Sequence, residues 1–126
     1  MRAAAGGFAL VLTLAASAVL ADGDEGRSLA VMATAYNSLP YQTDDEPAIG
    51  AWGDSLRPGM RAIAVSRDLL ALGLTRGVEV SIEGLPGTYR VLDKMGKRWQ
   101  KRIDIYMGED VTAARRWGVR EVRIRW

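Results

Sequence analysis

The sequence contains no cysteine and no histidine among its 126 residues. The absence of cysteine excludes a disulfide framework, a thiolate nucleophile, a zinc ribbon and a c-type haem site. The absence of histidine removes the Ser-His-Asp triad, the most common metal ligand and the usual general base at neutral pH. Any acid–base chemistry must therefore come from Asp, Glu, Tyr or Lys side chains.

The first 21 residues have the features of a secretory signal. Arg2 gives a positive start, an apolar stretch covers residues 8–20, and an acidic run follows over residues 22–25. Val19 and Ala21 are small residues at the two positions that a signal peptidase reads. The apolar stretch is short beside the roughly 20 residues of a membrane-spanning helix, so we expect cleavage after residue 21 and no retained anchor. With no Cys after the signal, a bacterial lipid anchor is excluded.

The rest of the chain has an ordinary composition but an uneven charge. Hydrophobic residues make up 48% and charged residues 25%, which is typical of one globular domain. Residues 22–89 carry 5 basic and 10 acidic side chains, whereas residues 90–126 carry 11 basic and 5 acidic ones. A basic face attracts polyanions, and for an exported protein we expect a cell-wall or surface polymer and no nucleic acid. A solvated basic face without a partner is an equal alternative.

Hydrophobic alternation predicts a mainly β protein. After a short polar linker over residues 22–28, the expected strands are residues 28–36, 60–65, 77–83, 88–93, 102–107 and 122–126. Residues 37–59 are expected to be one long loop, and such loops in a compact domain are usually functional or mobile.

One helix is predicted over residues 109–117. Acidic residues open this segment, Arg115 and Arg116 lie in its last turn, and Gly118 ends it. A single helical turn is also expected over residues 68–74. Six short strands with one helix suit a small closed barrel, which leaves no open sheet edge.

Two carboxylates are candidates for chemistry. Asp104 lies between Ile103 and Ile105 in a strand, and Asp93 ends another strand before a basic loop. A buried carboxyl has a raised pKa, which a general acid needs near neutral pH and which glycosidic bond cleavage uses. The alternatives are that Asp104 faces solvent or pairs with Arg102 or Lys101, and that Asp93 caps a turn.

A set of aromatic and polar side chains is a candidate for binding sugars. They are Tyr36, Asn37, Trp52 and Trp99. Aromatic side chains are more often part of a core, and this is the default for Tyr36. Asp44-Asp45-Glu46 lacks the spaced oxygen pattern of an EF-hand, so neither a metal nor a cofactor is expected.

Several segments together resemble the Asp-Asp-Asp (3D) domain family, which is related to the barrel of membrane-bound lytic transglycosylase A. The matching segments are Thr34-Ala35-Tyr36-Asn37, Ala51-Trp52-Gly53, Ile63-Ala64-Val65-Ser66, Leu72-Gly73, Val80-Ser81-Ile82-Glu83-Gly84, Leu92-Asp93-Lys94-Met95, Arg102-Ile103-Asp104-Ile105-Tyr106 and Trp117-Gly118-Val119-Arg120. They follow the family order and extend over about residues 32–126.

The resemblance implies a six-stranded double-psi β-barrel with one short helix over residues 29–126, and action on peptidoglycan glycan strands. The catalytic acid of the family would correspond to Asp104, and a groove carboxylate to Asp93. The implied reaction is that of a lytic transglycosylase, which forms 1,6-anhydro-N-acetylmuramic acid ends with a single Asp as acid and base. At the position of the family's first Asp this chain has Ser66, with Asp68 two residues later.

Three functions are left open by the sequence. The leading one is a monomeric, exported, periplasmic or extracellular lytic transglycosylase. The second is a glycan-binding barrel without catalysis, as in expansin-like wall proteins. The third is a structural or inhibitor-like periplasmic protein that holds a partner by its basic face. The surroundings of Asp104 discriminate among them, because function depends on the site and not on the fold.

Overall fold

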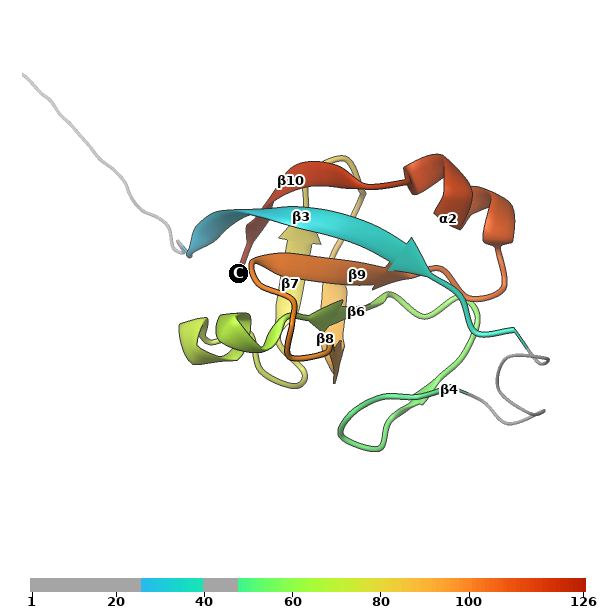
Figure 1. Ribbon diagram of the computed structural model, residues 1–126, viewed down its shortest axis with the longest axis horizontal. Helices are drawn as coiled ribbons and strands as arrows, with labels where there is room; N and C mark the ends of the chain where they lie inside the picture. Colours follow the sequence, from blue (N-terminus) through green and yellow to red (C-terminus); the bar gives the residue numbers. More distant parts are fainter. Residues whose placement is uncertain (1–25, 40–47) are drawn as a thin grey trace, which may run out of the picture.

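The computed structural model describes residues 26–39 and 48–126. Within these residues the chain is mainly β, with six strands in one mixed sheet and one short α-helix (Figure 1). The six strands are β3 (Ser28–Tyr36), β6 (Ala62–Val65), β7 (Glu79–Ile82), β8 (Tyr89–Lys94), β9 (Arg102–Tyr106) and β10 (Arg120–Arg125). Each overlaps one strand predicted from the sequence, so the prediction of a mainly β fold is confirmed.

The strand order β10-β3-β9-β6-β8-β7 returns to its beginning, because β7 also pairs with β10. Two pairings are parallel, β3 with β9 and β6 with β8, and the other four are antiparallel. Beside β3 and β10, the backbones of Arg27 and Trp126 exchange two hydrogen bonds of 2.7 and 3.0 Å. Each of the six strands therefore has two neighbours, although β10 pairs with β7 only at Ile124 and Arg125.

Alternating apolar side chains fill the space enclosed by the strands. Ile103 and Ile105 of β9 lie opposite Val65 and Ile63 of β6, and all four are fully buried. The other strands add Val31, Ala33, Val80, Ile82, Val91, Val122 and Ile124 to the same core. Burying one aliphatic side chain contributes roughly 1.5–3 kcal/mol, so this core fixes the register of the strands.

The predicted helix is present as α2 (Val111–Trp117). Asp110 precedes it as the N-cap, and its carboxylate accepts a hydrogen bond of 2.9 Å from the backbone N–H of Ala113. Trp117 is buried at the other end of the helix, where its Nε1 donates to the carbonyl of Ala33 at 3.2 Å. This contact attaches α2 to β3.

The segment between β3 and β6 differs from the prediction of a continuous loop. Its described part contains two very short strands, β4 (Ala48–Ile49) and β5 (Ser55–Leu56), which pair in an antiparallel hairpin. A two-residue strand has no measurable hydrophobic period, so this hairpin could not be predicted from the sequence. A second small apolar cluster, formed by Leu56, Ala62, Leu92 and Tyr106, packs the hairpin against the sheet.

The remaining sequence predictions are met in part. The helical turn expected over residues 68–74 is a 3-10 helix, η3 (Arg67–Leu72). The expected linker includes Ser28, which is already the first residue of β3. The predicted signal peptide (residues 1–21) and the acidic segment 44–46 lie outside the described residues.

Candidate active site

Asp93 and Asp104 lie on the outer face of the sheet, on either side of β6. Asp104 of β9 pairs with Ala64, and Ala64 pairs with Asp93 of β8 on its other side. Side chains of directly paired residues point to the same face. Since Ile103 and Ile105 fill the core, Asp104 points outward, as the alternation in the sequence predicts. The backbones of the two acidic residues are separated by two strand spacings, about 10 Å.

A β-bulge brings Asp93 to this outer face. Val91 of β8 pairs with Ile63 and Asp93 pairs with Ala64, so Leu92 is an extra residue without a partner in β6. Strict alternation after the buried Val91 would turn Asp93 toward the core. The extra residue shifts the alternation by one and re-aims the carboxylate outward, a known consequence of bulges beside functional sites.

Burial raises the pKa of the Asp104 carboxyl above its ordinary value. Two neighbours oppose this shift: the Thr34 hydroxyl donates a hydrogen bond to Asp104 Oδ1 at 3.1 Å, and Arg102 adds a positive charge. The negative charge of Asp93 acts with burial to raise the pKa. Among the described residues, no ion pair includes Asp104. Asp104 is therefore a half-buried acid that holds its proton more readily than an exposed Asp.

The carboxylate of Asp93 is held by backbone N–H groups. Its Oδ1 accepts hydrogen bonds from Ala51 at 2.8 Å and from Lys94 at 2.9 Å. The bond from Ala51 requires the hairpin turn to lie directly on β8, and it does: a Cβ added to Gly50 would lie 2.1 Å from the carbonyl oxygen of Leu92. Glycine at position 50 therefore permits the contact that orients Asp93.

Tyr36 lies at the end of β3, opposite Tyr106 of β9, with ring centroids 5.5 Å apart. Its hydroxyl is buried and has no hydrogen-bond partner among the described residues. Burial raises the pKa of this hydroxyl, and the negative charges of Asp93 and Asp104 raise it further. Tyr36 is thus a neutral hydrogen-bond donor within electrostatic range of both carboxylates. The default expectation for Tyr36, a place in the core, agrees with its burial. A contact between Tyr36 and a sugar stays a prediction.

Asn37 is bound to the protein backbone. Its Nδ2 donates to the carbonyls of Met107 at 3.3 Å and Gly108 at 3.1 Å. These bonds tie the end of β3 to the segment after β9. They assign a structural role to the amide group, and a contact between Asn37 and a substrate stays a prediction.

Trp52 and Trp99 each contact basic side chains. The Lys94 ammonium lies 5.3 Å from the centre of the Trp52 ring. The Trp99 ring has two guanidinium groups near it, Arg98 at 4.5 Å and Arg102 at 4.3 Å. Because Arg102 also acts on Asp104, the Trp99 cluster is electrostatically connected with the candidate acid. Stacking of either indole on a sugar stays a prediction.

Ser66, which stands at the position of the first Asp of the family that the sequence resembles, is fully buried. Its hydroxyl accepts a hydrogen bond of 3.0 Å from the backbone N–H of Arg102, and its own N–H donates to the Arg102 carbonyl at 2.9 Å. Asp68 is partly desolvated, which opposes ionisation, but hydrogen bonds from Ser66 and the Lys101 backbone lower its pKa below the ordinary value. Both residues fix the beginning of β9.

Two residues of the site were not selected from the sequence. The sequence places Thr34 and Ala64 only in predicted strands and in matched segments, with no role of their own. Their positions opposite Asp104 follow from the pairing of β9 with β3 and β6, which a single sequence does not reveal.

No group of three or more potential metal-ligating side chains occurs in residues 26–39 and 48–126. Within the same ranges, no helix is long and apolar enough to cross a membrane. Comparison of the chain with protein-family models and with curated proteins finds no match.

Proposed function

We propose that this protein is an exported lytic transglycosylase that cleaves peptidoglycan glycan strands on a double-psi β-barrel, with Asp104 as its single acid and base. The observation that carries the proposal is the state of Asp104. It is a half-buried carboxyl with a raised pKa, it faces outward from the sheet, and it forms no ion pair with a described residue. A general acid needs this combination of retained proton and access to substrate.

In the proposed reaction, Asp104 first donates its proton to the oxygen that links N-acetylmuramic acid to N-acetylglucosamine. The bond from C1 of the muramic ring to that oxygen breaks, and the leaving sugar departs as an alcohol. The Asp104 carboxylate then accepts the proton of the muramic 6-hydroxyl while the 6-oxygen forms a new bond to C1. The product is a 1,6-anhydro ring, Asp104 is protonated again, and no water is consumed.

The neighbours of Asp104 suit this cycle. The Thr34 hydrogen bond orients the carboxyl group and stabilises its ionised form between the two proton transfers. The buried Tyr36 hydroxyl keeps its proton beside the two carboxylates, so it adds no negative charge to the site. Asp93 adds negative charge near the C1 carbon, which becomes positively charged in the transition state.

A glycan-binding barrel without catalysis is the second candidate. The contacts of Trp52 with Lys94, and of Trp99 with Arg98 and Arg102, favour it. Aromatic rings beside basic groups form a surface that holds an acidic glycan without breaking a bond.

Incubation of the purified protein with peptidoglycan sacculi, followed by mass spectrometry of the soluble products, tests the proposal. The wild type is expected to release anhydro-muropeptides, and Asp104→Asn is expected to release none. Asp110→Asn is the matched control, because Asn is as good an N-cap as Asp and position 110 lies at α2. Products one water heavier would replace the mechanism with hydrolysis. Binding to sacculi without release by any variant would support the second candidate.

A further inference from the structure

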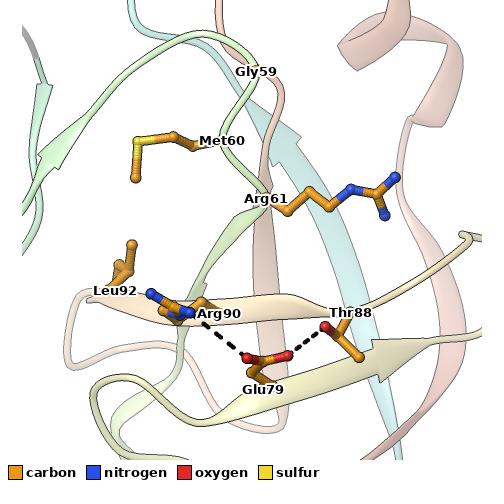
Figure 2. A pocket seen from close by; sticks show the side chains of 7 residues that line it. All are labelled: Gly59, Met60, Arg61, Glu79, Thr88, Arg90 and Leu92. Atoms are coloured by element: carbon orange, nitrogen blue, oxygen red, sulfur yellow. Dashed lines mark hydrogen bonds and ion pairs between the residues drawn. The ribbon is translucent and has the colours of Figure 1, made fainter.

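An open pocket of about 380 Å³ lies on the outer surface of β7 and β8, beside the candidate active site. Figure 2 shows Met60 and Leu92 on one side, Arg61 on the other, and Glu79 between Arg90 and Thr88. Its volume is within the usual range for small-ligand sites. The pocket combines an apolar wall with one acidic and two basic side chains.

The two charges at the base of the pocket are near each other without being fully engaged. Arg90 Nη2 lies 3.6 Å from Glu79 Oε2, and both side chains are 56% exposed. By contrast, Arg76 and Asp54, which belong to a neighbouring hollow, form two short contacts of 2.6 and 2.8 Å. A guanidinium has five N–H donors, so Arg90 keeps donors for a further acceptor.

The Glu79 carboxylate is oriented and ionised. The Thr88 hydroxyl donates to Glu79 Oε1 at 2.6 Å. This hydrogen bond, together with the charge of Arg90, lowers the pKa of Glu79 below its ordinary value. At neutral pH the pocket therefore presents a fixed anion and a partly free cation, which are complementary to a ligand that carries both charges.

The pocket and the candidate active site share strand β8. Leu92 lines the pocket, and the next residue is Asp93. Arg90 and Asp93 are three residues apart, which corresponds to about 10 Å along a strand. A substrate bound at Asp93 and Asp104 can therefore place a branch of its structure in the pocket.

We propose that this pocket binds the zwitterionic amino-acid head group of a peptide branch, with the carboxylate on Arg90 and the ammonium on Glu79. The carbon chain of the branch lies against Met60 and Leu92. In peptidoglycan, the stem peptide on muramic acid supplies such a group where it contains meso-diaminopimelate, whose side chain ends in an amine and a carboxylate on one carbon. This assignment of the branch rests on the proposed function.

The binding of two free tetrapeptides tests the proposal. Calorimetry measures their affinities, and the NMR signals of the Met60 and Leu92 methyl groups report where they bind. One peptide contains meso-diaminopimelate and the other contains lysine, which has the amine but not the second carboxylate. We expect the first to bind at least ten times more tightly and to shift both methyl signals. Arg90→Gln is expected to remove this preference. Arg125→Gln, on the exposed face of β10, is the matched control and should keep it.

Equal binding of the two peptides, absence of binding at millimolar concentration, or an unchanged preference in Arg90→Gln would each overturn the proposal. Adding peptide-free glycan chains and disaccharide-tetrapeptides as ligands separates the sources of affinity. If glycan is cleaved without any dependence on the peptide, the pocket proposal fails and the proposed function stands. If the free peptide binds but no glycan is cleaved, the head-group site stands and the transglycosylase assignment fails.

Discussion

The substitution Gly50→Ala tests whether the hairpin turn positions Asp93. The new Cβ would lie 2.1 Å from the carbonyl oxygen of Leu92, and both atoms belong to backbone-fixed positions. Carbon–oxygen contacts of about 3.3 Å are the closest that proteins tolerate, so the turn must move by about 1 Å. The hydrogen bond from the Ala51 N–H to Asp93 is 2.8 Å now and would lengthen to almost 4 Å, beyond hydrogen-bonding distance.

The expected loss of stability follows from this broken bond. A hydrogen bond to a charged group contributes about 1.5–3 kcal/mol. For a domain of this size, each kcal/mol changes the melting temperature by about 4–8 °C. We therefore expect Gly50→Ala to melt about 10 °C lower than the wild type. If Asp93 takes part in glycan cleavage, the rate on sacculi should fall as well, because its carboxylate is no longer oriented.

Thermal unfolding by circular dichroism, with the sacculus assay in parallel, measures both effects. Gly96→Ala is the matched control, since a Cβ at position 96 meets no atom within 4 Å. Gly96→Ala should melt within about 2 °C of the wild type, as a surface substitution does. The reasoning is refuted if Gly50→Ala and Gly96→Ala melt at the same temperature, because the turn would then not be docked on β8.

The other predictions concern Asp104 and its neighbours. Because the folded pKa of Asp104 is raised, its ionisation opposes folding: this penalty is absent below the ordinary Asp pKa and complete above the raised one. Asp104→Asn should therefore be more stable than the wild type at pH 7 and lose this advantage as the pH falls below about 4. Denaturant titrations at both pH values measure the difference. Equal stability of the two proteins at pH 7 would contradict the desolvation of Asp104. Thr34→Val removes a hydrogen bond that favours the ionised carboxyl, so the alkaline limb of the pH–rate profile should move to higher pH, whereas Thr112→Val on α2 should leave it unchanged. Tyr36→Phe removes a buried hydroxyl without a described partner, so the free energy of unfolding should stay equal or rise by about 1 kcal/mol in a denaturant titration; a clear loss of stability would contradict the absence of a partner.

The sheet was predictable from the sequence because its signals are local. Strands such as β9 and β10 alternate apolar and polar residues, and the helix α2 has its acidic beginning, basic last turn and terminal glycine within one short segment. The hairpin of β4 and β5 was not predictable. Its two-residue strands depend on a backbone contact with β8, a segment about 40 residues away in the chain.

The two carboxylates of the candidate site could be selected from the sequence, but their surroundings could not. Asp104 stands out because a carboxylate between two buried isoleucines is unusual. Its partners Thr34 and Ala64 are separated from it by 70 and 40 positions, and only strand pairing brings them together. The outward direction of Asp93 is opposite to what strict alternation gives, since it depends on the bulge at Leu92.

The outer face of β6 explains why the two carboxylates are partly desolvated and still reachable. This strand alternates large residues with alanine, and all four of its residues are buried. Ile63 and Val65 fill the core, whereas Ala62 and Ala64 form the floor between β8 and β9. Ala62 is covered by Leu56, Leu92 and Tyr106, whereas Ala64 lies directly between Asp93 and Asp104. A larger side chain at position 64 would press against both neighbouring carboxylates, and a polar side chain there would stabilise the ionised form of Asp104 and so lower its pKa. The small residue between the two acids is therefore as much a condition of the proposed chemistry as the acids themselves.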